Sequence, residues 1–136
     1  MMADNKQKII VGVDDNELNL RLLEVVIKSQ NYTFMGADSG AACLDLVGRV
    51  EPTLILLDVA MPDMDGFETC RRLRAIPRLA RVPIMFVTAF HAPRERQAAI
   101  DAGGNDFLSK PIIAQALLDR VQHWVFPPGP GQPALQ

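Results

Sequence analysis

Three aspartates follow directly after apolar segments of the chain. Asp14 and Asp15 come after residues 9–13, and Asp58 comes after residues 53–57. If these segments are neighbouring parallel strands, their carboxyl ends meet at one edge of the sheet and the three carboxylates lie close together. Carboxylates at close range raise one another's pKa, and such oxygen ligands suit Mg²⁺. The spacing therefore predicts a magnesium site.

Taken alone, the first acidic segment has a simpler interpretation. Asp14 to Glu17 would form a solvated loop in which Asp15 or Asn16 caps the next helix. The coincidence with Asp58 favours the metal site over this interpretation.

Two more polar residues follow apolar segments. Thr88 comes after residues 83–87, and Lys110 follows residues 106–108 and precedes Pro111. A hydroxyl and an ammonium group at the same edge can bind the oxygens of a phosphoryl group while a metal neutralises its charge. Each residue alone also fits a strand-end hydrogen bond or a solvated loop. Together with the aspartates, they indicate phosphoryl chemistry.

The elements that position these side chains alternate between two patterns, which is typical of an α/β fold with a parallel sheet. The apolar runs predict strands at residues 9–13, 32–37, 53–57, 83–87 and 106–108. Between them, apolar residues at helical spacing each predict one apolar helix face. These residues are Leu18, Leu22, Val25 and Val26; Ala42, Leu46 and Val50; Cys70 and Leu73; and Leu117, Leu118, Val121 and Trp124.

Length and composition fit one domain. The chain has 136 residues, of which 49% are hydrophobic, and we expect residues 1–126 to fold and the Pro- and Gly-rich residues 127–136 to form a flexible tail. A net charge of −2 offers no broad basic surface for nucleic acid. No apolar run is long enough for a membrane span, so we expect a cytoplasmic protein. Cys43 and Cys70 lack metal or redox spacing and are predicted to pack in the interior.

Four segments of the sequence resemble the signature of response-regulator receiver domains, the CheY-like superfamily of two-component signalling. They are Val13-Asp14-Asp15-Asn16-Glu17, the stretch from Leu57 to Gly66, Val87-Thr88-Ala89 and Ser109-Lys110-Pro111. The similarity runs from about Lys8 to Trp124. It implies a doubly wound, flavodoxin-like (βα)5 fold with strand order 2-1-3-4-5. We expect a stand-alone regulator, and a fragment of a larger regulator or hybrid kinase is the alternative.

The resemblance also implies a role for each site residue. Asp58 would accept a phosphoryl group from a histidine kinase, a phosphotransfer protein or a small acyl phosphate. Asp15, Asp58 and the backbone carbonyl of Ala60 would bind Mg²⁺ directly, and Asp14 would bind it through water. Thr88 and Lys110 would hold the phosphoryl oxygens, and a cis peptide is usual before the proline that follows the lysine.

The same resemblance implies a switch. Thr88 and Phe107, which stands where tyrosine is common, would move together and reshape the face made by the fourth helix, fifth strand and fifth helix. That face would bind a downstream protein target, as a monomer or as a phosphorylation-dependent dimer. Ala60 and Phe90 stand at positions that influence hydrolysis, and they favour a long-lived phosphorylated state. Phe107 also fits plain core packing.

Other functions remain open at this point. A haloacid-dehalogenase-like phosphatase needs an Asp-x-Asp motif after its first strand, whereas Asp14 and Asp15 are adjacent. A flavodoxin-like nucleotide binder would not place acidic residues in its first loop. The main alternative is an interaction module of the same fold that does not depend on phosphorylation. We expect a signalling switch rather than an enzyme, with kinase specificity on the first helix around Asn19, Leu20 and Leu23.

Overall fold

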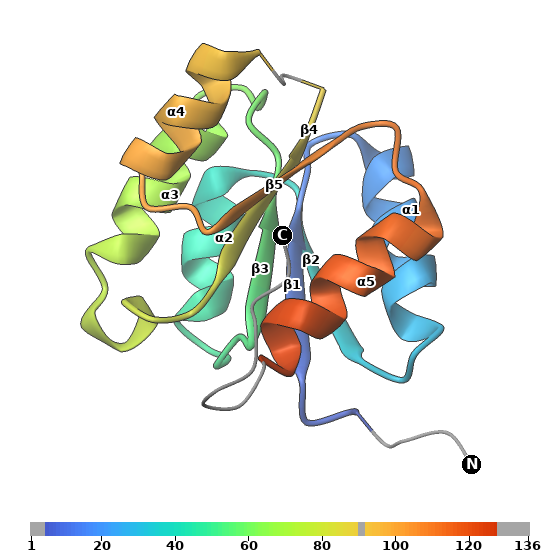
Figure 1. The fold of residues 1–136 in the computed structure, drawn as a ribbon. Coiled ribbons are helices and arrows are strands. Elements are labelled where there is room, and N and C mark those ends of the chain that lie inside the picture. Colours follow the sequence, from blue (N-terminus) through green and yellow to red (C-terminus); the bar gives the residue numbers. More distant parts are fainter. Residues whose placement is uncertain (1–4, 90–91, 128–136) are drawn as a thin grey trace.

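The computed structural model describes residues 5–89 and 92–127 and shows helices alternating with strands (Figure 1). The strands are β1 (Ile9–Val13), β2 (Thr33–Ala37), β3 (Leu54–Leu57), β4 (Ile84–Thr88) and β5 (Asp106–Ser109). The helices are α1 (Glu17–Lys28), α2 (Gly40–Val47), α3 (Gly66–Arg74), α4 (Pro93–Asp101) and α5 (Ala114–Val125), with a 3₁₀ turn, η1 (Pro77–Leu79), between α3 and β4. The predicted tail from residue 128 onward lies outside the described residues.

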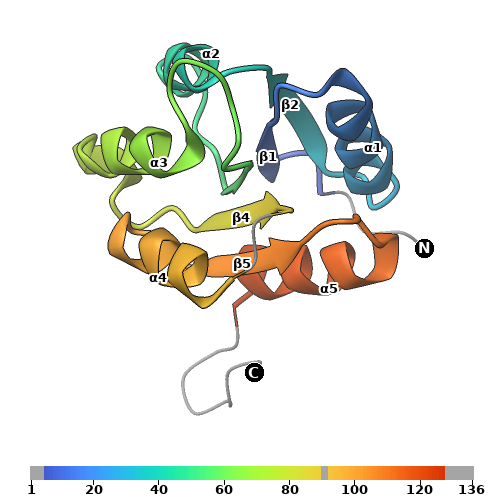
Figure 2. The same cartoon turned by 90° about the horizontal axis from the view of Figure 1, so that it is seen from above.

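The five strands form one parallel sheet in the order β2-β1-β3-β4-β5, which confirms the predicted fold and strand order. All residues of β3 and β4 are buried, because helices cover both faces of the sheet. Helices α1 and α5 lie on one face, and α2, α3 and α4 lie on the other (Figures 1 and 2). The sheet therefore separates two apolar cores.

Local signals fix where three helices begin. The side chains of Asn16, Ser39 and Asp65 each accept a hydrogen bond from a backbone N–H in the first turn of the helix that follows. These caps satisfy donors that the helix itself leaves unpaired. Two of them, Asn16 and Asp65, come directly after the acidic loops, so the helices hold those loops in place.

The face that α1 buries agrees with the predicted one only at Val26. Leu18, Leu22 and Val25 are 79%, 42% and 58% exposed, whereas Leu23, Val26 and Ile27 pack in the core. The apolar residues of α1 occupy more than one side of the helix, so spacing alone does not determine which side faces the sheet. Leu23, at 2% exposure, also cannot contribute to a kinase-recognition surface, and that part of the specificity prediction is wrong.

Cys43 and Cys70 are free and fully buried, as predicted. Burial raises the pKa of the Cys43 thiol to about 12 and that of Cys70 to about 11, which keeps both in the unreactive thiol form. Within residues 5–89 and 92–127, none of the helices has both the length and the apolar character that crossing a bilayer requires.

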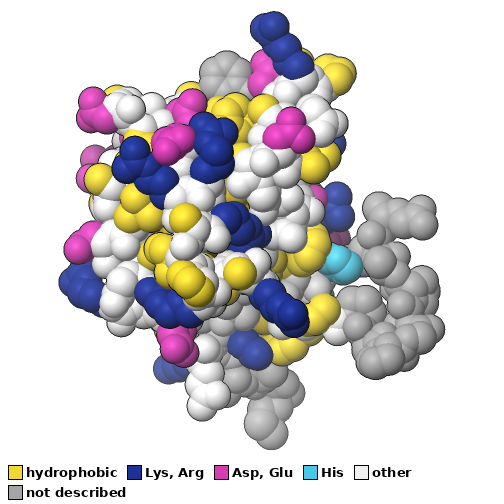
Figure 3. All heavy atoms as spheres, turned by 90° about the vertical axis from the view of Figure 1, so that its left-hand side faces the viewer, with side chains coloured by type: hydrophobic (Ala, Val, Ile, Leu, Met, Phe, Trp, Pro, Cys, Tyr) yellow, Lys and Arg dark blue, Asp and Glu magenta, His cyan; other side chains and the backbone are white. Residues whose placement is uncertain are grey.

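Charged side chains are mixed over the face that carries α2, α3 and α4 (Figure 3). Arg71 and Arg72 both pair with Glu68 on α3, and Arg49 pairs with Asp45 on α2. These exposed pairs lie one helical turn apart, where such contacts contribute little to stability.

Arg74, at the end of α3, has a different role. Its guanidinium donates hydrogen bonds to the carbonyl oxygens of Leu79, Val82 and Gly103 at 2.6–2.9 Å and to Oδ1 of Asn105 at 2.7 Å. Burial lowers the pKa of Arg74, which shows that this cation is partly removed from water. One side chain thus joins the end of α3 to the loops that precede β4 and β5.

We expect Arg74→Leu to lower the free energy of unfolding by about 2–4 kcal/mol, because several carbonyl groups lose their donor. Arg72→Leu, on the same helix but exposed, is the matched control and should stay close to the wild type. Urea unfolding measures both. Equal stabilities for the two variants would contradict the role of Arg74.

Candidate functional site

The predicted acidic residues come together at the carboxyl ends of β1 and β3. Carboxylate oxygens of Asp14, Asp15 and Asp58 all lie within 4.8 Å of one another. Asp14 and Asp58 are buried, at 1% and 5% exposure, while Asp15 is exposed at the rim. Three carboxylates so close fit a hard divalent cation such as Mg²⁺, which takes oxygen ligands and retains water on its open side.

Lys110 partly balances this negative charge. Its Nζ donates to Oδ2 of Asp14 at 2.8 Å and lies 3.4 Å from Oδ2 of Asp58. The lysine side chain is only 16% exposed, so both ion pairs are shielded from water. The peptide between Lys110 and Pro111 is cis, as the resemblance implied.

The Asp58 carboxylate is held from several sides. Its Oδ1 accepts a hydrogen bond from the backbone N–H of Val59 at 2.9 Å, and the hydroxyl of the buried Thr88 lies near enough to favour the charged form of the carboxylate. Thr88 is fully buried at the end of β4. The hydroxyl therefore lies at the site without any movement of β4.

Burial and the nearby Asp14 raise the pKa of Asp58, although Lys110 and Thr88 oppose the shift. Desolvation is the largest cause, because it penalises the charged carboxylate. Ionised Asp58 is thus held in an environment that favours charge balance by a bound cation.

The raised pKa has a consequence for stability. Because folded Asp58 holds its proton to higher pH than the unfolded chain does, ionising it costs stability as pH rises through the folded pKa. We expect Asp58→Asn to be more stable than the wild type at neutral pH without divalent cations. The difference should shrink as pH falls below the pKa of Asp58.

Thermal unfolding in EDTA between about pH 4 and about pH 8 tests this, a range that spans the ordinary titration of carboxylates. Asp45→Asn, which alters an exposed aspartate on α2, is the control and should show no such gain. A variant at Asp58 that is less stable than the wild type at neutral pH would overturn the electrostatic account.

Gly66, the first residue of α3, lets that helix lie directly against the acceptor loop. A Cβ at this position would stand 2.1 Å from the carbonyl oxygen of Asp58 and 2.8 Å from Cα of Val59. The backbone N–H of Gly66 donates to the carbonyl of Val59 at 2.8 Å. A residue without a side chain is therefore required here.

Comparison with known proteins identifies the family of this fold and site. Residues 10–122 match the family model described as the response regulator receiver domain. The chain belongs to this family. The receiver domain is 40% identical over 113 residues to the response regulator PleD of Caulobacter vibrioides, a match that covers 83% of this chain and 25% of PleD. It therefore spans about a quarter of that relative.

Two further matches extend over nearly the whole of the other chain. The polar-differentiation response regulator DivK of Brucella ovis is 30% identical over 118 residues, covering 87% of this chain and 96% of DivK. The solved receiver domain of the sensor histidine kinase PA1611 of Pseudomonas aeruginosa matches with a TM-score of 0.81 and 30% identity, covering 87% and 97% of the two chains. That structure has a magnesium ion coordinated in its active site cleft.

The remaining predicted residues lie around the receiver domain's acidic site and its β5 edge. Ala60 is exposed at the rim, two residues beyond Asp58. Phe107 is half-buried on β5, where the guanidinium carbon of Arg96 lies 5.0 Å from the centre of its ring. Phe90 lies outside the described residues.

Sequence reasoning missed two contributors to this geometry. The close approach of Gly66 to the Asp58 backbone and the cation of Arg96 over Phe107 both depend on three-dimensional proximity. The sequence alone gives no sign of how near the helix that begins at Gly66 comes to Asp58.

Proposed function

We propose that this receiver domain is a phosphorylation switch in which Asp58 accepts a phosphoryl group from a histidine kinase or phosphotransfer protein. The observation that carries the proposal is the contact of one buried carboxylate, Asp58, with the ammonium of Lys110 and the hydroxyl of Thr88, beside Asp14 and Asp15. A nucleophile, a cation and a hydroxyl donor meet at one point, which is the arrangement that phosphoryl transfer needs.

Asp58 supplies the nucleophile. A carboxylate oxygen forms a bond to phosphorus while the bond from phosphorus to the donor breaks, leaving an acyl phosphate on Asp58. Lys110, already 3.4 Å from Asp58, moves from pairing with a carboxylate to pairing with phosphoryl oxygens, and Thr88 donates to another of them. Bound Mg²⁺ supplies charge neutralisation for the transferring group.

The residues that would hold Mg²⁺ are Asp15, Asp58 and the backbone carbonyl of Ala60, with Asp14 acting through water. The ion pair between Asp14 and Lys110 supports this division, because it leaves the exposed Asp15 as the freer ligand. The chain modifies itself and acts on no other substrate, so its role is signalling rather than enzymatic turnover. Its site of action is the cytoplasm.

The exposed apolar side chains of α1 support the kinase as donor. Leu18, Leu22 and Val25 lie one to two helical turns apart, and Ile113, 63% exposed, stands just before α5. An apolar patch beside the acidic site can hold a helix of the donor while phosphate passes to Asp58. We therefore assign to Leu18 and Leu22 the role in kinase recognition that the sequence analysis assigned to Leu23.

The output surface is the face of α4, β5 and α5. Phe107 is half-buried under Arg96, and Thr88 lies at the end of the neighbouring strand β4. Phosphorylation would pull Thr88 toward the phosphoryl group and let Phe107 move inward, which would weaken the contact with Arg96 and change this face for a protein target.

Backbone amide spectra with and without acetyl phosphate and Mg²⁺ test the switch against an interaction module that needs no phosphate. We expect amide shifts across α4, β5 and α5 in the wild type and none there in Asp58→Asn. A wild-type protein that takes up phosphate but keeps these resonances unchanged would favour the phosphorylation-independent module.

A further inference from the structure

One edge of the sheet has no further strand beside it in residues 5–89 and 92–127. Strand β2 forms this edge, between α1 on one face and α2 on the other, and pairs only with β1 (Figures 1 and 2). Two surface hollows, of about 450 and 240 Å³, border β2 at its start and at its end. Neither the acidic site nor the face of α4, β5 and α5 includes this strand.

The backbone of β2 offers hydrogen-bonding groups along this edge. The N–H of Thr33 and the carbonyl oxygen of Ala37 bond to the residues that flank β1, at 3.2 and 3.1 Å. Successive residues of a strand direct their backbone groups alternately to one side and to the other. Phe34 and Gly36 therefore direct their N–H and carbonyl groups away from β1, where an added strand can bind them.

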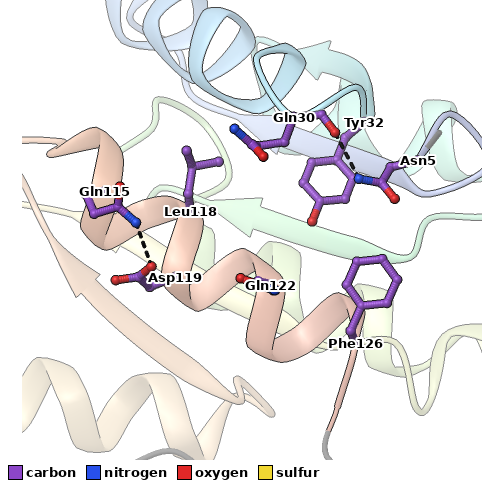
Figure 4. A pocket seen from close by; sticks show the side chains of 8 residues that line it. All are labelled: Asn5, Gln30, Tyr32, Gln115, Leu118, Asp119, Gln122 and Phe126. Carbon is purple, nitrogen blue, oxygen red and sulfur yellow. Dashed lines mark hydrogen bonds between the residues drawn. The ribbon is translucent and has the colours of Figure 1, made fainter. Parts of the chain in front are cut away.

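The start of β2 is held firmly from the inner side. Tyr32, the residue before β2, is 6% exposed, and Figure 4 shows its side chain pointing toward α5. Asn5 Nδ2 donates to the carbonyl oxygen of Gln30 at 2.9 Å, and the Thr33 hydroxyl donates to the carbonyl oxygen of Lys6 at 2.7 Å. An incoming strand thus meets an edge that is already ordered, which favours binding.

Exposed charges differ between the two ends of this edge. The charged residues that line the hollows or directly follow β2 are Lys6 and Lys28 at its start, and Glu17, Arg21, Glu24 and Asp38 at its end. Lys28 and Glu24 pair with each other at 2.9 Å. The difference therefore rests on the ammonium of Lys6 at one end and on two carboxylates with Arg21 at the other.

Such an edge is complementary to a second copy of itself. Two-fold symmetry makes the paired strands antiparallel, so the start of β2 in one copy lies beside the end of β2 in the other. With Phe34 opposite the partner's Gly36, Tyr32 stands opposite the partner's Asp38. Lys6, which lines the same hollow as Tyr32, then meets that carboxylate. A parallel pairing would instead bring like charges together.

We propose that the edge of β2 is a docking site for a second copy of this chain, which extends the sheet through both copies. Phe34 and Gly36 exchange hydrogen bonds with the same residues of the partner, and Lys6 of each copy pairs with the partner's Asp38. The absence of a side chain at Gly36 allows the close approach of another backbone. This dimer goes beyond the proposed switch: it requires no phosphoryl group and uses the edge of the sheet opposite β5.

Sedimentation of the unphosphorylated protein, up to millimolar concentration, tests for the dimer. The mass should rise from the 15.0 kDa of one chain toward twice that value, in the wild type and in Asp58→Asn alike. Hydrogen exchange then locates the contact. The amides of Phe34 and Gly36 should become more protected as concentration rises, whereas that of Met35, which faces β1, should not change. A persistent monomer, or a dimer in which the two edge amides stay unprotected, would overturn the proposal.

Charge reversal tests the antiparallel register. Lys6→Glu and Asp38→Lys each place like charges opposite each other twice in the dimer, so each should raise the dissociation constant about tenfold or more. An equal mixture of the two variants should dimerise as the wild type does, because both contacts then join opposite charges. Arg94→Glu and Asp101→Lys, at exposed positions of α4, are the matched controls and should each dimerise normally. A dimer that neither reversal weakens, or that mixing does not restore, would refute the pairing.

Discussion

Gly66→Ala should lose about 3 kcal/mol of its free energy of unfolding and most of its phosphoryl acceptance. The added Cβ would meet the Asp58 carbonyl oxygen at 2.1 Å and the Asp58 carbonyl carbon at 2.8 Å. These are backbone atoms of the loop that carries the acceptor, so they cannot move aside as a flexible side chain can. Overpacking of this kind typically costs about 1–3 kcal/mol, and here the acceptor itself is displaced.

Urea unfolding and phosphoryl uptake are the two measurements for this variant. Gly48→Ala, at the end of α2, is the matched control: the nearest atom to its Cβ is a carbonyl oxygen at 3.2 Å, and its φ of −72° suits any residue. It should remain near the wild type in both measurements. If Gly66→Ala behaved like the control, the close packing of α3 on the acceptor loop would be refuted.

Lys110→Met should destabilise the protein by about 3–5 kcal/mol in the absence of divalent cations. Removing the ammonium leaves two carboxylates, on Asp14 and Asp58, whose side chains are 2% and 7% exposed and which repel each other. Added Mg²⁺ should recover a large part of the loss, because it replaces the missing positive charge at the same site.

Thermal unfolding with EDTA and then with Mg²⁺ measures both parts of this expectation. Lys28→Met, the control, removes an exposed lysine that pairs with Glu24. It should show neither the loss of stability nor the recovery with Mg²⁺. A Lys110→Met protein that is destabilised but not rescued by Mg²⁺ would mean that the lysine contributes packing rather than charge balance.

The sequence predicted the features that depend on order along the chain. Apolar runs followed by polar residues located the strands and placed Asp14, Asp58 and Thr88 at one sheet edge, because all parallel strands of such a sheet end at the same side. The motifs that resemble the receiver family then supplied the strand order. This part of the prediction succeeded because buried strands consist largely of apolar residues, which can be recognised in the sequence.

Contacts between segments that are distant in the sequence, and the choice of which helix face is buried, could not be predicted in the same way. Helix α1 carries apolar residues on more than one side, so spacing did not identify Leu23 and Ile27 as core or Leu18 as exposed. Arg74 shares the last turn of α3 with Arg71 and Arg72, yet only its hydrogen bonds reach Gly103 and Asn105, which lie far away in the sequence. The role of Gly66 likewise depends on the distance between two backbones.

The most direct test of the central claim is the intact mass of the protein after incubation with acetyl phosphate, with and without Mg²⁺, for the wild type and Asp58→Asn. The account predicts the addition of one phosphoryl group to the wild type, dependent on Mg²⁺ and absent from the variant. Asp15→Asn, which removes a metal ligand but keeps the acceptor, should show a strongly reduced gain. A wild-type protein that gains no phosphoryl group from acetyl phosphate or from candidate histidine kinases, or a variant that gains as much as the wild type, would contradict Asp58 as the acceptor.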